Sequence, residues 1–190
     1  MFFWICAFFL GCPHAVELSG DELLGRMSMA LPAQWEMVKN RRVMGNHIVV
    51  LRSPDGCCMV QAHLIPEDRS SRGLPLDIVA DTLSMSSAYL RGYHSELLGG
   101  NTIELDGREA WATVVRRHHG PHERLYTTVI TRIPDHIVHL SLEAPFTASL
   151  SVTTAWQSVI ESFNFPEDPP EEAPFFEPPP QSFQEMGSVD

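Results

Sequence analysis

The chain has 190 residues, 44% of them hydrophobic, which suffices for one folded domain with flanking segments. Thirteen basic residues stand against 24 acidic ones, and the net charge of −11 disfavours binding to nucleic-acid phosphates or anionic lipid. The excess acid is concentrated at the C-terminal end, where residues 166–190 contain seven acidic residues and no basic one. The first 165 residues are nearly balanced, with 17 acidic and 13 basic residues.

The N-terminal residues 1–11 read MFFWICAFFLG, an uncharged run shorter than the 20 or so residues needed to span a bilayer. This length is typical of a secretory signal, and the Phe-Leu-Gly-Cys sequence ending at Cys12 resembles the bacterial lipobox. We therefore expect residues 1–11 to be a signal segment and Cys12 to be lipidated, giving an exported, periplasmic, membrane-anchored lipoprotein. No Lys or Arg precedes the apolar run, which leaves open cleavage without lipidation and a true start codon further upstream.

Two further segments flank the predicted domain. Residues 12–25 contain turn-forming residues and little periodicity, and we expect them to form a tether between anchor and domain. Residues 166–190 contain seven prolines and seven acids, so they cannot bury enough apolar surface to offset chain entropy, and we expect a disordered tail. The aromatic residues of this tail, Phe175, Phe176 and Phe183, are either incidental or a short docking motif.

Residues 26–165 carry the periodicity of a folded domain. Alternating apolar residues on both sides of Pro54-Asp55-Gly56 predict a hairpin. Asp106-Gly107 is a second strong turn signal, and His119-Gly120-Pro121-His122 is a third. The predicted strands cover residues 48–52, 58–65, 102–105, 110–116, 124–132 and 138–142, the last with one buried face and one partly wet face.

Two segments have the longer period of an amphipathic helix. The first starts at Pro75 and places Val79, Leu83, Ser86, Leu90 and Tyr93 on one face. The second follows Pro145, with Thr147 as its predicted N-cap, and its apolar face is Val152, Trp156, Val159 and Phe163. The order of strands, helix, strands and helix predicts an α+β fold in which two helices pack on an antiparallel sheet.

Several short patterns in this region resemble the PsbP-like and DcrB-like proteins. Residues 27–35, MSMALPAQW, are similar to an opening apolar strand followed by Leu-Pro-x-x-Trp. Residues 106–110, DGREA, resemble a hairpin entry of that family, and residues 135–140, DHIVHL, resemble the strand that follows. Residues 159–165, VIESFNF, are similar to its closing helix and exit. The resemblance covers residues 26–165.

The resemblance implies an α-β-α sandwich used for binding rather than catalysis. That family includes lumenal photosystem subunits, periplasmic lipoproteins, a Ran-binding import factor and chaperones of secreted effectors. One fold therefore serves unrelated partners, and the fold alone does not specify the function. The signal segment favours the bacterial lipoprotein branch.

The densest group of polar side chains is residues 116–124, RRHHGPHER, at the tip of a predicted hairpin. Imidazole suits zinc and similar divalent metals, but adjacent histidines on a strand point to opposite faces, and flanking arginines disfavour a cation. The arginines suit an anion, such as a carboxylate of an acidic partner, and a solvated hairpin tip is the third interpretation. The candidates are Arg116, Arg117 and Arg124 for the partner or anion contact and His118, His119 and His122 for the metal.

The remaining chemistry-bearing residues have no recognised catalytic spacing. Cys57 and Cys58 are adjacent, and neighbouring cysteines rarely reach disulfide geometry, so we expect Cys58 to be a buried strand residue. No serine-hydrolase, zinc-protease or phosphate-binding motif is present. The tryptophans at 35, 111 and 156 are expected in the core.

The sequence thus predicts a non-catalytic, exported domain that binds another envelope protein through its exposed sheet face or the Arg/His hairpin. A cytosolic chaperone of the same fold, which shields an apolar segment of a partner, is the first alternative. A protein that binds a divalent metal at the histidine hairpin is the second, and that metal is the only cofactor the sequence suggests.

Overall fold

The computed structural model describes residues 15–19, 26–43, 46–90, 92–119, 121–148 and 150–165. They form strands and helices in the predicted order. The strands are β1 Ala15–Ser19, β2 Arg26–Ala30, β3 Glu36–Val43, β4 Asn46–Arg52, β5 Met59–Pro66, β6 His94–Leu105, β7 Arg108–His119, β8 His122–Ile133 and β9 His136–Pro145. The helices are α1 Leu76–Leu90 and α2 Leu150–Ser162. The predicted signal segment, Cys12 and the acidic tail lie outside these residues.

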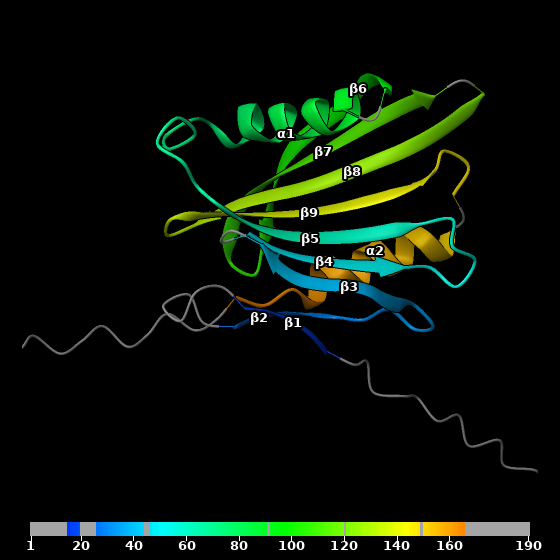
Figure 1. The fold of residues 1–190 in the computed structure, drawn as a ribbon, viewed down its shortest axis with the longest axis horizontal. Coiled ribbons are helices and arrows are strands. Elements are labelled where there is room, and N and C mark those ends of the chain that lie inside the picture. Colours follow the sequence, from blue (N-terminus) through cyan, green and yellow to red (C-terminus); the bar gives the residue numbers. More distant parts are fainter. Residues whose placement is uncertain are drawn as a thin grey trace, which may run out of the picture.

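Seven of the strands form one antiparallel sheet in the order β3-β4-β5-β9-β8-β7-β6, and β1 pairs with β2 as a separate ribbon. Strand β9 inserts between β5 and β8 and is antiparallel to both. Figure 1 shows α1 beside β6, β7 and β8, whereas α2 lies behind β4 and β5. The structure confirms the α+β class, with two helices packed on opposite faces of an antiparallel sheet.

Local turn chemistry explains two of the hairpins. Asp106 and Gly107 both have positive φ, 47° and 75°, as a two-residue hairpin between right-twisted strands requires. In the β4–β5 turn, the Ser53 hydroxyl donates to the Asp55 carboxylate at 2.6 Å, and the chain turns through Gly56 at φ 71°.

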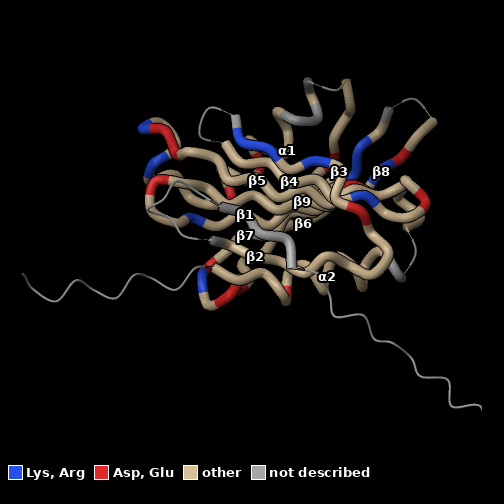
Figure 2. The backbone as a smooth tube through the Cα atoms, turned by 60° about the horizontal axis from the view of Figure 1, so that its bottom comes forward, with Lys and Arg blue, Asp and Glu red and all other residues tan. Residues whose placement is uncertain are grey.

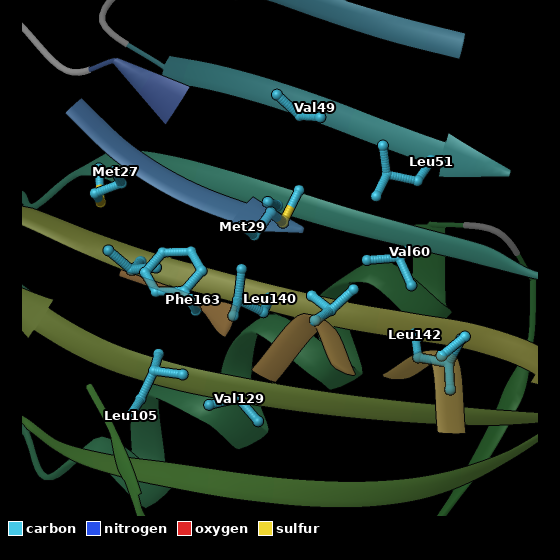
Figure 3. Close-up of a cluster of buried hydrophobic side chains, with 14 of the residues drawn as sticks. Met27, Met29, Val49, Leu51, Val60, Leu105, Val129, Leu140, Leu142 and Phe163 are labelled. Atoms are coloured by element: carbon cyan, nitrogen blue, oxygen red, sulfur yellow. The ribbon is translucent and has the colours of Figure 1, made fainter. Parts of the chain in front are cut away.

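The main core lies between the sheet and α2. Alternate residues of the central strands, such as Leu140 on β9 and Val60 on β5, point to this back face and are fully buried. Figure 3 shows Met27, Met29 and Phe163 from β2 and the end of α2 converging on the same side chains. Each large apolar side chain buried in this way stabilises the fold by about 1.5–3 kcal/mol. The ribbon and α2 are thus attached to the sheet through this layer.

A second, smaller cluster lies on the opposite, front face of the sheet. Val79 and Ala80 of α1 pack on Ile130 of β8 and Ile137 of β9, and Trp111 of β7 borders the cluster. The residues of β9 that point to this front face are Ile137, His139, Ser141 and Glu143. Both faces of β9 are buried, so the prediction of a partly wet face is wrong.

Other differences from the sequence prediction concern exposed or short elements. Residues 15–19 form a strand rather than part of a tether, because they pair with β2. Strand β3 was missed, and β6 is longer than the predicted strand 102–105. Ser86 is exposed, whereas Ser84 is fully buried, so the covered face of α1 differs from the predicted one. Thr147 is not the N-cap of α2, which begins three residues later.

Candidate functional site

The Arg/His hairpin is the β7–β8 connection, and its register distributes the candidate residues over two faces. Arg117 pairs with Arg124 across the hairpin, while His118 pairs with Glu123. Because neighbouring residues of a strand alternate between faces, Arg117 and Arg124 project to the front, and Arg116 and His118 project to the back. The structure does not gather the three arginines into one patch.

Arg116 is already engaged by groups of the same chain. Its Nη2 donates to both carboxylate oxygens of Glu123, at 2.8 and 2.9 Å, and its guanidinium lies 4.7 Å from the ring centre of Phe146. These two charge-assisted hydrogen bonds, both from one nitrogen, hold the side chain beside Glu123. Arg116 is therefore a positioned cation at the hairpin surface.

Arg117 is fully buried, which the sequence pattern did not predict. Its Nη2 donates to the carbonyl of Ser84 in α1 at 2.8 Å, and its guanidinium lies 3.4 Å from the ring centre of Tyr126. The side chain fastens α1 to the sheet and presents no surface to a partner. The expected three-arginine contact surface is wrong at this residue.

Arg124 also has internal partners. Its Nε lies 3.1 Å from the buried carboxylate of Glu143, and its Nη2 donates to the Cys57 carbonyl at 2.8 Å. Both Cys57 and Cys58 are free thiols, and burial is the main cause that raises the pKa of Cys58. Arg124 thus connects the β4–β5 turn to the centre of the sheet.

The histidines of the hairpin do not form a metal-binding group within the described residues. His118 Nδ1 lies 3.5 Å from Glu123, His122 is exposed, and the side chain of His119 lies outside the description. Among the described side chains, no three His, Cys, Asp or Glu residues come together to hold a metal ion. The zinc site stays a prediction.

The front of β4 and β5 forms a second candidate site, which we call the open sheet face: Ile48, Val50, Met59, Gln61 and His63. Helix α1 packs on β6, β7 and β8, and Figure 1 shows no helix in front of β4 and β5. All five side chains are partly exposed. A sheet face with apolar and polar side chains on rigid strands is a preformed surface for a partner.

Antiparallel register extends this face to the edge strand β3. Lys39 pairs with Val50, which in turn pairs with Gln61. Arg41 pairs with Ile48, which in turn pairs with His63. Side chains opposite one another on neighbouring strands are about 5 Å apart, so these cations border the apolar centre. Figure 2 shows basic residues spaced along β3 at the edge of the sheet.

On its other side, the open sheet face borders a buried polar layer beneath α1. The ring of His139 contacts that of His63 edge-on at 5.7 Å between ring centres. Burial, followed by the nearby charges of His63 and Arg117, lowers the pKa of His139 to about 3. His139 is therefore neutral at neutral pH and adds no positive charge to this layer.

A hollow of about 490 Å³ lies on the back of the molecule, between the Leu-Pro loop and α2. Its lining includes Trp35, Val152 and Ala155, with Asp55 at its border. Hydrogen bonds from Ser53 and Cys57 lower the pKa of the Asp55 carboxyl. Apolar and neutral polar side chains line the hollow together with this one acidic group, and no basic residue is among them.

Sequence reasoning named an exposed sheet face but did not identify its residues. The signal was weak because β3 reads EMVKNRRV, which lacks strict alternation. A bulge between Met37 and Lys39 interrupts the period and leaves Val38 exposed. Only the register with β4 shows that Lys39 and Arg41 share a face with Ile48 and Val50.

The arrangement of these elements is that of a PsbP-like fold. The structure of cyanobacterial PsbP (CyanoP) from Synechocystis sp. PCC 6803 matches with a TM-score of 0.56 and 16% identity, over 83% of this chain and 96% of that one. The Ran-binding protein Mog1p of Saccharomyces cerevisiae matches with a TM-score of 0.56 and 14% identity, over 81% of this chain and 95% of that one.

These comparisons confirm the fold that the sequence resemblance implied, and at such identities they show the fold alone. No family model matches the sequence, and no curated protein sequence matches it. Neither α1 nor α2, the helices of the described part of the chain, is long and apolar enough to cross a membrane.

Proposed function

We propose that this chain is a non-catalytic protein-binding domain of the bacterial cell envelope, exported by its N-terminal segment and anchored by a lipid on Cys12. The observation that carries the binding role is the open sheet face. It is held by paired strands, flanked by α1, and bordered by the cations of β3. The fold supports this role, since a neighbour of the same fold is described as Ran-binding.

The chemistry of the face indicates what kind of partner it takes. Ile48, Val50 and Met59 offer an apolar centre, and Lys39 and Arg41 offer positive charge along one side. A segment of a protein with apolar side chains and flanking carboxylates is complementary to this surface.

Site-specific photo-crosslinking in the native host tests the binding role. A photoreactive residue at Gln61, in the centre of the open sheet face, is expected to give one discrete protein adduct in the envelope fraction. The same residue at Thr153, on the exposed side of α2, is the matched control and is expected to give none. Equal adducts from both positions, or none from Gln61, would contradict binding through this face.

Intact mass and membrane fractionation test export and anchoring separately. The wild-type chain is expected to lose residues 1–11, to gain the mass of acyl chains, and to sediment with membranes. Cys12→Ser is expected to remove the acyl mass and to release the protein from membranes. A full-length, unmodified product would refute the lipoprotein and favour the cytosolic chaperone of the same fold.

A further inference from the structure

Strand β3 is one of the two edge strands of the seven-stranded sheet, and its described side chains are exposed. Strand β3 pairs only with β4, so one row of its backbone N–H and C=O groups faces outward. Every residue from Glu36 to Arg42 is exposed. Proteins usually protect such an edge, because it is a template for another strand.

The charge of this edge limits what can pair with it. Lys39, Arg41 and Arg42 lie within four residues, and the one acid of the strand, Glu36, is engaged by Arg52. Among the described residues, no carboxylate forms an ion pair with Lys39 or Arg41. An acidic extended segment is therefore the complementary occupant.

The chain itself contains such a segment in its last 25 residues. Residues 166–190 carry seven acids and no base, the reverse of the edge. Between positions 170 and 178 the prolines are Pro170, Pro174 and Pro178, all at even positions. In a strand, alternate N–H groups point to the same edge, so the odd residues 171, 173, 175 and 177 keep a complete row of donors.

The geometry of the chain exit brings this segment to the correct end of the strand. The Phe165 N–H donates to Asp106 Oδ2 at 2.7 Å, and Arg108 lies 4.9 Å from the Phe165 ring centre. The register runs from Ala110 on β7 through β8, β9, β5 and β4 to Arg42, so Arg108 and the end of β3 share one end of the sheet.

The distance along that end is within reach of the tail. Five strand spacings of about 4.8 Å give roughly 24 Å from β7 to β3. Extended chain covers about 3.3 Å per residue, so about eight residues beyond Phe165 are enough. A segment that enters at the end of β3 and continues along it runs antiparallel to β3, the orientation of every neighbouring pair in this sheet.

We propose that residues 173–177 of the acidic tail add in cis to β3 as an eighth, antiparallel strand. This places Glu177 of the strand, and Glu171 and Glu172 of the approaching segment, beside Lys39, Arg41 and Arg42. The docked tail covers the basic border of the open sheet face. The docking is independent of the proposed function, and only its consequence rests on that function: an acidic partner must displace the tail before it binds.

Hydrogen–deuterium exchange of the intact chain, without any partner, tests the docking. The control for charge is a variant with a neutralised tail, E171Q/E172Q/E177Q. In the wild type, the outward amides of residues 36–43 are expected to exchange roughly tenfold more slowly than in this variant. The factor is that of a tethered ligand at millimolar effective concentration that binds with a Kd near 0.1 mM. Arg41→Glu is expected to remove the protection, and Arg69→Glu, an exposed arginine outside β3, is the control. Unchanged exchange in the neutralised tail would refute docking.

Two further comparisons separate the alternatives. Ala173→Pro keeps the charge but deletes a donor from the odd row, so it is expected to abolish protection, and retained protection would overturn strand addition. Protection that rises with protein concentration, together with a sedimenting dimer, would overturn docking in cis in favour of a second copy. Because no partner is present, failure here leaves the crosslinking test of the proposed function unaffected.

Discussion

The pKa of His139 makes a quantitative prediction about stability and pH. The side chain is 6% exposed, and its pKa in the folded protein is about 3, against an ordinary value of 6.5. The folded state therefore keeps His139 neutral as the pH falls, while the unfolded chain binds a proton near pH 6.5. The stability contributed by this group is fully present above pH 6.5 and is lost progressively as the pH falls from 6.5 to 3.

The magnitude follows from the two pKa values. Protonation of this histidine in the unfolded chain lowers the free energy of unfolding by about 2 kcal/mol between pH 7 and pH 5. Each pH unit below 6.5 contributes about 1.4 kcal/mol. The glutamine of His139→Gln is neutral at every pH, so the variant does not lose this stability as the pH falls. The difference in unfolding free energy between wild type and variant is thus expected to shift by about 2 kcal/mol in favour of the variant from pH 7 to pH 5.

Urea unfolding at pH 7, 6 and 5 measures this difference. Wild type and variant differ only at position 139, so the comparison isolates the effect of that side chain. His122→Gln, which changes an exposed histidine of the hairpin, is the control and is expected to follow the wild type at every pH. Parallel curves for wild type and His139→Gln would refute the burial argument.

Three substitutions, and a fourth as a control, test the packing. Gly100→Ala is expected to cost about 1–3 kcal/mol, because its Cβ would lie 3.0 Å from an indole ring, whereas Gly99→Ala meets nothing within 4 Å and should change stability by less than about 0.5 kcal/mol. Arg117→Lys is expected to cost about 1–3 kcal/mol in urea unfolding, since an ammonium cannot both stack on Tyr126 and reach the Ser84 carbonyl as the planar guanidinium does. Phe163→Ala should cost about 3–5 kcal/mol by the same assay, because the ring is buried where β2 meets the end of α2. Equal effects at the two glycines, or stability changes below 0.5 kcal/mol for the other two, would contradict these contacts.

The sequence was informative wherever local chemistry decides the structure. Asp106-Gly107 predicted a hairpin because two successive positive φ angles need such residues, and the structure has them there. Helical spacing alone predicts the burial of Val159 in α2 and of Phe163 directly after it. In both cases the determining residues are close together in the chain.

Tertiary pairing decided what the sequence could not show. Arg117 looks like a surface cation in a run of polar residues, and only the position of α1 over that face buries it. His139 and Glu143 alternate with apolar residues as solvent-facing residues do, yet β9 is a central strand covered on both sides. The β3 border depends on a register across a bulge, which no local pattern encodes.

The polar layer beneath α1 leads to a prediction in which two similar substitutions have opposite signs. Thr128 and Thr131 both lie on β8 and are buried, Thr128 on the face beneath α1 and Thr131 on the opposite face. Within the described residues, Thr128 Oγ1 has no hydrogen-bond partner, whereas Thr131 Oγ1 donates to the Glu109 carbonyl at 2.7 Å. Valine preserves the shape and β-branching of threonine and replaces the hydroxyl by a methyl group.

Thr128→Val therefore relieves a buried, unsatisfied hydroxyl and is expected to raise the free energy of unfolding by about 1 kcal/mol. Thr131→Val leaves the Glu109 carbonyl without its donor and is expected to lower it by about 1 kcal/mol. Urea unfolding of the two variants in parallel measures both signs. If both substitutions destabilise equally, the Thr128 hydroxyl has a hydrogen-bond partner of its own. The polar layer would then contain no unsatisfied hydroxyl at this position whose cost the α1 contacts must offset.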